Sequence, residues 1–306
     1  MDVTNDVYAN NEESLGMSPD GQWLAGAWKR LGVQRRVRLL VLDGRRRHVG
    51  AGKLRPVHVL LEHAGGRPEF DQDAIPRVGP DGTVYVSWIN GPNEKSLKKN
   101  VAMIDESTDG GATWGTDQVA AQIVSPIGGL LPNSSYRVFE DVHATVDQQT
   151  GRVVLTYTDQ KSGASNIYAT HNLAAGDITQ WSAPAAVKAS GQEQFFPWMS
   201  SAPNGRVDLV FYDRSCDAAS DKLDCVTLAS SADDGATWGY TTLLGTGFDG
   251  DHFHTCLAPD DPDACGRSFL GDYIAVASTD AKAQALWTGN GSSGMDVFSA
   301  RATFSP

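Results

Sequence analysis

The chain of 306 residues lacks any apolar run that approaches the roughly 18 residues of a membrane-spanning helix. It also lacks a Gly-x-Ser-x-Gly nucleophile elbow, a phosphate-binding glycine loop and a dinucleotide-binding fingerprint. Basic residues are outnumbered, with 25 Lys and Arg against 37 Asp and Glu and a formal net charge of −12. This charge argues against nucleic acid and anionic membrane surfaces as partners, and it suits a protein that binds cations.

Cysteine is scarce, and no Cys-x-x-Cys pair is present. The simplest pairing joins Cys216 to Cys225 and Cys256 to Cys265, although four cysteines allow three connectivities. Their loops are rich in Asp and Pro, which indicates two disulfides and an oxidising compartment; the alternative is four reduced thiols in a cytosolic protein. The chain starts with a polar segment rather than a signal peptide. We therefore expect a secreted or periplasmic protein whose signal is absent from this chain.

One eight-residue pattern occurs twice, as STDGGATW at 107–114 and as SADDGATW at 231–238. Its Asp and Ser can bind nearby backbone N–H groups, its Gly can supply a positive φ, and Thr-Trp can start a return strand. The pattern resembles the Asp-box of the sialidase-type β-propellers, also called the bacterial neuraminidase repeat. In that superfamily the box is a folding device, so the resemblance implies architecture and leaves activity open. The box residues are Ser107, Asp109, Gly111, Trp114, Ser231, Asp233, Gly235 and Trp238.

Helical periodicity is essentially absent, and a strand–turn–strand pattern repeats along the chain. Each copy has a short strand, a turn with Gly, and a second strand that ends in an aromatic residue. The second strands are expected at 21–28, 82–88, 151–157, 205–212 and, more weakly, 283–287. The repeat predicts an all-β propeller of four-stranded blades in one domain, residues 1–306. Five or six blades are possible, and six are favoured for the full-length parent.

Residues 30–65 do not fit the repeat, because Arg clusters at 35–38 and 45–47 replace the expected third strand and box of the first unit. One interpretation is a basic surface insertion. The other is a reading-frame error in the source gene, since GC-rich codons for 42–50 read one base later can encode Ser-Thr-Asp-Gly-Gly-Ala-Thr-Trp. On the second interpretation the first blade should not pair normally.

Carboxylates recur just before the innermost strands, where a propeller has its axial mouth. Aligning the units on their turns gives a column of Glu12, Asp73, Asp141, Phe196 and Asp272. Converging carboxylates should have raised pKa values or bind a cation, calcium being a possible cofactor, unless each only caps its own strand. A second column, expected to bind loop backbone, contains Asn90, Asp159, Asp213 and Asn290.

The resemblance to sialidases implies three arginines that hold a substrate carboxylate, a Tyr/Glu nucleophile pair and an Asp acid/base. Candidate arginines are Arg137, Arg214 and Arg267; the alternative is that each pairs with a neighbouring Asp. Tyr273 is the nucleophile candidate, with Glu140 or Glu193 as its partner, and the other catalytic candidates are Asp73, Asp141 and Asp272. The family's Phe-Arg-Ile-Pro motif is missing, with only a faint echo at 74–77.

Two aromatic segments, QFFPW at 194–198 and FLGDY at 269–273, resemble a subgroup of secreted bacterial Asp-box proteins, over roughly residues 70–304. Trp198 could stack on a sugar at the mouth, although core packing explains such residues as often. His252 and His254 form the only close His pair, and 260–263 is acidic, but neither has the spacing of a complete metal site.

Two classes of function follow. The first is a secreted glycan-active protein, a sialidase-type exo-glycosidase with its site at the axial mouth. The alternative is a non-catalytic Asp-box propeller that binds glycan or protein there. In both cases we expect a monomer that binds a glycan or glycoprotein, not nucleic acid.

Overall fold

The computed structural model describes most of the chain, and in the described part the only helical element is the short 3-10 turn η1 (Arg214–Asp217); the rest is strand and loop. The described residues are 10–17, 23–30, 36–43, 71–91, 100–252, 254–255, 267–268, 270–291 and 295–305. The chain divides into two compact units, each considered by itself. Unit 1 contains 1–123, 142–155 and 170–183, and unit 2 contains 124–141, 156–169 and 184–306.

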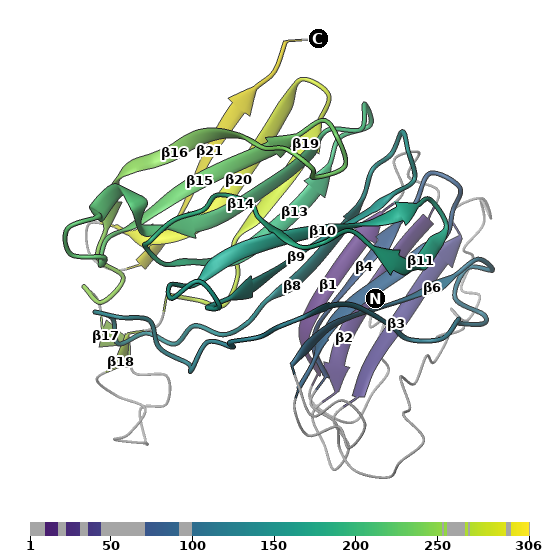
Figure 1. Ribbon diagram of the computed structural model, residues 1–306, viewed down its shortest axis with the longest axis horizontal. Coiled ribbons are helices and arrows are strands. Elements are labelled where there is room, and N and C mark those ends of the chain that lie inside the picture. The colour runs from purple at the N-terminus through teal and green to yellow at the C-terminus, as the bar shows by residue number, and fades with distance from the viewer. Residues whose placement is uncertain are drawn as a thin grey trace, which may run out of the picture. The chain divides into compact units, whose positions relative to one another are not determined.

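Antiparallel meanders make up the fold, and neighbours in sequence are neighbours in each sheet (Figure 1). The first sheet has β1 (Asn10–Met17), β2 (Trp23–Arg30) and β3 (Arg36–Asp43). The second has β4 (Asp71–Val78), β5 (Val84–Asn90), β6 (Val101–Ser107) and β7 (Gln118–Gln122). The third has β8 (Val142–Val146), β9 (Val153–Asp159), β10 (Asn166–Ala174) and β11 (Asp177–Trp181), with β12 (Ala185–Ala186) also on β10.

Unit 2 holds the remaining sheets. The fourth sheet has β13 (Gln194–Ser201), β14 (Val207–Asp213), β15 (Asp224–Ser231) and β16 (Gly239–Phe248). The last has β19 (Ala275–Thr279), β20 (Lys282–Asn290) and β21 (Met295–Thr303), and a ribbon joins β17 (His254–Thr255) to β18 (Arg267–Ser268).

The second strands of the repeat are the most buried. All seven residues of β5, β9 and β14 are buried, so their aromatic and β-branched side chains face protein on both sides. The outermost strand β16 is mostly exposed. This gradient from a buried second strand to an exposed fourth strand is that of a propeller blade. The predicted fold class, an all-β propeller of four-stranded antiparallel blades, is confirmed, and the five meanders of the described residues fall within the predicted five to six blades.

The first sheet corrects one expectation. Strand β3 pairs with β2 in unbroken register, from Trp23 opposite Asp43 to Arg30 opposite Arg36. The first unit therefore has a regularly paired third strand, although the reading-frame interpretation predicted that the first blade would not pair normally. Most of the segment 42–50, where the corrected reading frame would encode the box, is outside the described residues, because these stop at residue 43 and resume at residue 71.

Both copies of the repeated eight-residue pattern form the predicted hairpin turn with the same hydrogen bonds. In the first, Ser107 Oγ accepts from Gly111 N at 2.8 Å, and Asp109 accepts from Thr113 N and Oγ1 at 2.8 and 2.7 Å. In the second, the corresponding distances from Ser231 and Asp233 are 2.9, 2.8 and 2.6 Å. The central turn positions have positive φ in both copies, at Gly110 and Gly111 and at Asp234 and Gly235. Trp114 also donates to the carbonyl of Gly111, and Trp238 is half-buried at the matching position.

The innermost strands share a bulge where the carboxylate column was predicted. Register shifts occur between Asn11 and Ser14, between Gln72 and Ile75, and between Phe195 and Trp198. Within the second and third bulges, Asp73 and Phe196 have φ of 55° and 50°. Non-glycine residues in this region cost roughly 1–3 kcal/mol and often mark functional sites. The internal alignment of these positions is therefore matched by the backbone.

Candidate functional site

Four of the predicted site residues come together in unit 2. Arg137 donates from Nε to Asp272 Oδ1 at 3.1 Å and from Nη2 to Asp272 Oδ2, which makes a two-point ion pair. Tyr273 follows Asp272, and its ring meets that of Trp198 edge-on at a centroid distance of 6.2 Å. We call Arg137, Asp272, Trp198 and Tyr273 the mouth cluster.

The mouth cluster is accessible to a ligand. The side chain of Arg137 is 58% exposed and that of Asp272 is 20% exposed. Tyr273 is 42% exposed, and Trp198 is half-buried at the edge of the core. An exposed ring presents a flat apolar face, and the adjacent guanidinium and carboxylate supply donors and acceptors. This combination suits a sugar, which has apolar C–H faces and polar hydroxyls.

Aromatic residues support the cluster from beneath. The Arg137 guanidinium lies 5.8 Å from the centroid of the Phe139 ring, which in turn contacts Phe196 at 5.4 Å. Phe196 is fully buried and touches Phe195 and Tyr212. In the predicted carboxylate column, Phe196 occupies the position that a carboxylate has in the other units. Its side chain belongs to the hydrophobic core.

Arg214, one of the three predicted substrate-binding arginines, is inaccessible. Its side chain and that of Asp224 are 0% exposed, and they pair at 2.9 Å through Arg214 Nε. Its Nη1 donates to the carbonyls of Pro132 and Asp221, and its Nη2 donates to the hydroxyl of Tyr136. The alternative interpretation, a structural ion pair with a neighbouring Asp, is the correct one here, because burial leaves the guanidinium no surface for a substrate.

The two glutamates predicted as partners of Tyr273 lie in different environments. Glu193 is buried, and its Oε2 accepts a hydrogen bond from Ser165 N at 2.6 Å. Its carboxylate therefore binds the backbone at the start of β10. Glu140 is half-buried three residues after Arg137, and burial raises the pKa of its carboxyl. A carboxyl with a raised pKa can hold a proton nearer neutral pH, as a general acid requires.

The remaining candidates are carried by other segments of the chain. Asp141 is buried just before β8, where its backbone N donates to Thr158 Oγ1 at 3.2 Å. Asp73 is buried in the β4 bulge of unit 1. Arg267 lies on β18, and its side chain is outside the described residues. Across the described ranges, no group of three His, Cys, Asp or Glu side chains could hold a metal ion.

Three members of the second column bind loop backbone as predicted. Asp159 accepts from the backbone N–H groups of Val124 and Ser125, both at 2.9 Å, and Asn290 donates to the carbonyl of Asp249. Asp213 accepts from the backbone of Ser215 and caps η1. These side chains hold loops in place.

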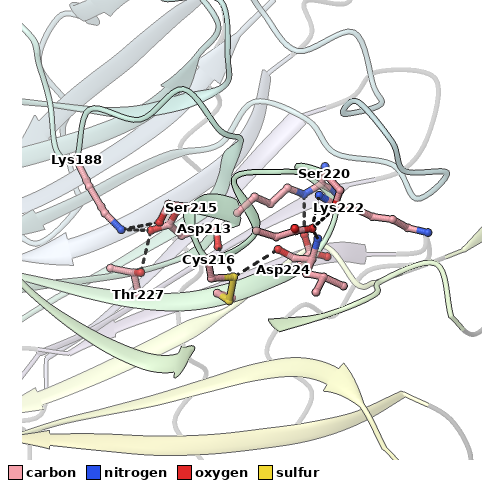
Figure 2. Close-up of a disulfide and its surroundings, with 12 residues drawn as sticks. Lys188, Asp213, Ser215, Cys216, Ser220, Lys222, Asp224 and Thr227 are labelled. Atoms are coloured by element: carbon pink, nitrogen blue, oxygen red, sulfur yellow. Dashed lines mark hydrogen bonds and ion pairs between the residues drawn. A yellow bond between two sulfur atoms is a disulfide. The ribbon is translucent and has the colours of Figure 1, made fainter. Parts of the chain in front are cut away.

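The predicted disulfide between Cys216 and Cys225 is present, with 6.3 Å between the two Cα atoms (Figure 2). It closes the loop between β14 and β15. Beside it Asp213 Oδ2 accepts from Lys188 at 2.5 Å and from Thr227 Oγ1 at 2.9 Å. Cys256 and Cys265 are outside the described residues.

Tyr136, Phe139 and Asp224 were not singled out from the sequence. In an extended segment Phe139 would lie on the same side as Arg137, and Tyr136 would lie on the opposite side. This alternation is only a weak signal. Asp224 directly precedes Cys225, but nothing in that order predicts a contact with Tyr136, 88 residues earlier.

The fold is that of a β-propeller. Within unit 2 the mouth cluster adds an accessible surface made of two aromatic rings and an ion pair. No family model matches the chain, and no curated protein does either. Among solved structures it is similar to the GH93 alpha-L-arabinofuranosidase of Fusarium graminearum in complex with arabinobiose, with 15% identity over 97% of this chain and 94% of that chain and a TM-score of 0.56.

Two further structures are similar. The alpha-L-arabinanase of Penicillium chrysogenum, also complexed with arabinobiose, has 13% identity over 96% of this chain and 94% of that chain, with a TM-score of 0.57. A protein of unknown function from Dyadobacter fermentans has 15% identity over 97% and 95%, with a TM-score of 0.50. At these identities the likeness shows a shared fold alone. Within the described residues, no helix has the length and apolar character to cross a membrane.

Proposed function

We propose that the protein is a glycan-active glycoside hydrolase that binds a terminal sugar on the mouth cluster. The observation that carries this proposal is the contiguity of Trp198, Tyr273, Asp272 and Arg137 at an accessible surface. Sugar sites commonly combine an aromatic platform with a few convergent polar groups. The fold shared with two proteins named as acting on arabinose-containing glycans supports the same class.

Hydrolysis of a glycosidic bond requires two carboxyl groups with different protonation. Asp272, held by the Arg137 guanidinium, is our candidate for the ionised group that acts as base or nucleophile. Glu140, whose pKa is raised by burial, is the candidate proton donor. Tyr273 remains the alternative nucleophile, and Asp73 and Asp141 remain alternative carboxylates. A divalent cation such as calcium is not required by these roles.

The substrate proposed is a neutral glycan rather than a sialoside. A sialidase-type site needs three arginines around the substrate carboxylate, and of the three candidates Arg214 is buried and fully engaged. The guanidinium of Arg137 is accessible but already paired with Asp272, so its charge is balanced, and the side chain of Arg267 is outside the described residues. Secretion or a periplasmic location is part of the proposal, since the Cys216–Cys225 bond suits an oxidising compartment.

Release of sugar from aryl α-L-arabinofuranoside, arabino-oligosaccharide and a fluorogenic sialoside tests this proposal. We expect turnover of a neutral substrate that falls at least about 100-fold in Asp272→Asn, as for loss of a general base or nucleophile. The matched control is Asp296→Asn, which makes the same change on the exposed strand β21. Full activity in Asp272→Asn would remove Asp272 from the chemistry, and turnover of the sialoside alone would replace the neutral substrate with a sialylated one.

A non-catalytic glycan-binding propeller is the second candidate. It is favoured by the two-point pairing of Asp272 with Arg137, because a carboxylate that accepts two donors is suited to orienting hydroxyls as well as to chemistry. Binding of arabino-oligosaccharide by calorimetry without any release of sugar would select this candidate. Binding together with release selects the hydrolase.

A further inference from the structure

Arg137 lies on a hairpin, residues 129–138, whose base is closed by backbone pairing. Leu130 and Arg137 form a β-bridge, and Val138 N donates to the carbonyl of Gly129 at 3.0 Å, so 129–138 closes on itself. At the tip, Ser134 Oγ donates to the carbonyl of Leu131 and Asn133 has a φ of 57°. Tyr136 is 1% exposed, whereas its neighbour Arg137 is exposed. The return arm of the hairpin thus buries Tyr136 and presents Arg137 outward, while Pro132 and Asn133 at the tip are exposed.

The buried side chain of Tyr136 belongs to a group of three side chains that bind one another. Tyr136 donates its hydroxyl to Asp224 Oδ2 at 2.6 Å and accepts from Arg214 Nη2 at 2.5 Å, while Arg214 Nε donates to Asp224 Oδ1 at 2.9 Å. We call these three residues the clasp. Burial raises the pKa of the Tyr136 hydroxyl well above its usual value, so it remains a neutral donor. In a buried setting each of these hydrogen bonds is costly to leave unmade.

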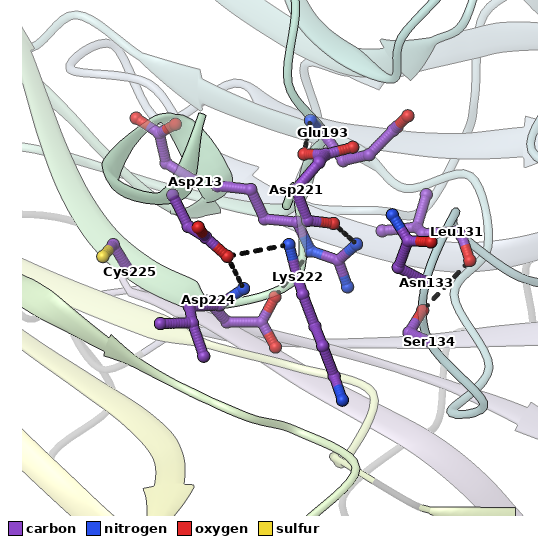
Figure 3. Close-up of polar contacts among 12 residues, drawn as sticks. Leu131, Asn133, Ser134, Glu193, Asp213, Asp221, Lys222, Asp224 and Cys225 are labelled. Atoms are coloured by element: carbon purple, nitrogen blue, oxygen red, sulfur yellow. Dashed lines mark hydrogen bonds and ion pairs between the residues drawn. The ribbon is translucent and has the colours of Figure 1, made fainter. Parts of the chain in front are cut away.

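The clasp also holds the backbone of the tip. Arg214 Nη1 donates to the carbonyl of Pro132 at 2.7 Å, and Asn133 Nδ2 donates to the carbonyl of Ser220 at 2.9 Å. Figure 3 draws Leu131, Asn133 and Ser134 of the tip with Asp221 and Asp224 of the disulfide-closed loop. Ser135 adds a contact to another segment, because its N and Oγ both donate to Asp251.

The space around the clasp is tightly filled. Gly250 passes so close to it that a Cβ at this position would lie 2.5 Å from the Tyr136 ring and 2.9 Å from Asp224 Oδ2. The disulfide at Cys225 directly follows Asp224 and anchors the strand that carries it. The position of the Tyr136 side chain is therefore restrained by Gly250, Asp224 and Arg214, which lie outside the hairpin.

We propose that Tyr136, together with Arg214 and Asp224, positions Arg137 at the mouth cluster by holding the hairpin at its tip. Tyr136 and Arg137 are adjacent in an extended segment, so their side chains point to opposite sides and a shift of one moves the other. The distal end of Arg137 is fixed by Asp272 and Phe139, and the clasp fixes its backbone. The part of this inference that concerns sugar binding rests on the proposed function.

The test compares Tyr136→Phe with Tyr212→Phe. Both tyrosines lie in unit 2, are at most 1% exposed and lose one buried hydroxyl, but that of Tyr212 bonds to the backbone of Thr288, away from the hairpin. The first readout needs no substrate: the rate at which phenylglyoxal modifies Arg137, followed by peptide mass spectrometry with exposed Arg301 as internal reference. We expect Tyr136→Phe to accelerate modification of Arg137 several-fold and Tyr212→Phe to leave it unchanged.

The second readout is the KM for the neutral glycan. We expect Tyr136→Phe to raise KM about tenfold with a smaller change in kcat, because a displaced binding group costs affinity and orientation. Gly250→Ala, which pushes on the same ring from outside, should shift both readouts in the same direction. Unchanged Arg137 modification in both Tyr136→Phe and Gly250→Ala would overturn the proposal. Equal acceleration of Arg137 modification in Tyr212→Phe would also overturn the proposal. Faster Arg137 modification in Tyr136→Phe without any change in KM would do the same. A wild-type protein that neither binds nor cleaves glycan would defeat the proposed function, while Arg137 modification would still decide the positioning role.

Discussion

Arg137 reaches across 135 residues of sequence to bind both carboxylate oxygens of Asp272, and this pair stands at the surface beside the Trp198–Tyr273 contact. In the same unit Arg214 and Asp224 form a second ion pair that is wholly buried. The two pairs use the same residue types for different purposes. The exposed pair is available to a ligand, and the buried one holds the hairpin that carries Arg137.

The two ion pairs should differ in their contribution to stability. Removing one partner of a buried pair leaves an uncompensated charge, so Arg214→Ala should lower the free energy of unfolding by about 3–5 kcal/mol. Arg137→Ala removes a solvent-exposed partner and should cost at most about 1 kcal/mol. Urea unfolding of both variants measures this difference. Equal losses would contradict the assignment of Arg214 to structure and of Arg137 to the site.

The aromatic pair should contribute to glycan affinity. Trp198→Ala and Tyr273→Ala each remove a ring face that a sugar can cover, and we expect each to weaken binding of the neutral glycan by about tenfold, or roughly 1.4 kcal/mol. Tyr240→Ala is the matched control, since Tyr240 is 50% exposed on β16. Calorimetric titration gives the affinities. A loss in Tyr240→Ala as large as in Tyr273→Ala would argue against the mouth cluster.

The clasp should make stability depend on pH through Asp224. Burial raises the pKa of its carboxyl to about 6, against the lowering effects of Arg214 and Tyr136, from an ordinary value of 3.8. The folded protein then binds a proton more tightly than the unfolded chain. The contribution of Asp224 to stability is therefore complete below 3.8 and is lost as the pH rises through about 6. In denaturation curves the stability of the wild type relative to Asp224→Asn should fall over this interval. A difference that rises over the same interval would reverse the assigned shift.

Opening the Cys216–Cys225 bond should destabilise unit 2. A disulfide that closes a short loop typically contributes about 2–4 kcal/mol, and this one also anchors the start of β15 next to Asp224. Dithiothreitol, or the double change Cys216→Ser and Cys225→Ser, should lower the unfolding midpoint. The double change isolates this bond, because dithiothreitol would also open the second predicted disulfide between Cys256 and Cys265, and an unaltered midpoint in the double variant would contradict the expected contribution.

The carboxylate of Asp109, in the first copy of the repeated turn pattern, should titrate unusually low. Hydrogen bonds from the Thr113 hydroxyl and backbone lower the pKa of Asp109 to about 2. Because the folded pKa is depressed, the stabilisation is present above the ordinary value of 3.8 and is lost as the pH falls towards about 2. Side-chain carbon NMR measures the titration directly. A midpoint near 3.8 would mean that the Thr113 bonds do not persist in solution.

The fold could be predicted because its signals are local. The two copies of the eight-residue turn pattern and the repeated strand–turn–strand pattern each consist of contiguous residues, and the turn chemistry of Ser, Asp and Gly is decided within eight positions. The second column was predictable for the same reason, since Asp159 and Asp213 bind loop backbone close to strand ends. The regular pairing of β3 was not predicted, because its Arg-rich sequence lacks the motif of the other units.

The site could be predicted only in part because it depends on long-range contacts. Aligning the units placed Asp272 and Tyr273 at a mouth position, and inspection of nearby arginines added Arg137. Sequence could not distinguish Arg137 from Arg214, since both precede or follow aromatic and acidic residues. The distinction arises from burial, which places Arg214 between Asp224 and the Tyr136 hydroxyl.

Hydroxyl-radical footprinting of the wild-type protein tests the central claim most directly. It would be run with arabino-oligosaccharide and, separately, with sialyllactose, and with sucrose at equal concentration to correct for radical scavenging. The account predicts that arabino-oligosaccharide lowers oxidation of Trp198 and Tyr273 and leaves the exposed Tyr240 unchanged. Unaltered oxidation of Trp198 and Tyr273 in both sugars, or protection confined to another surface, would contradict a glycan site at the mouth cluster.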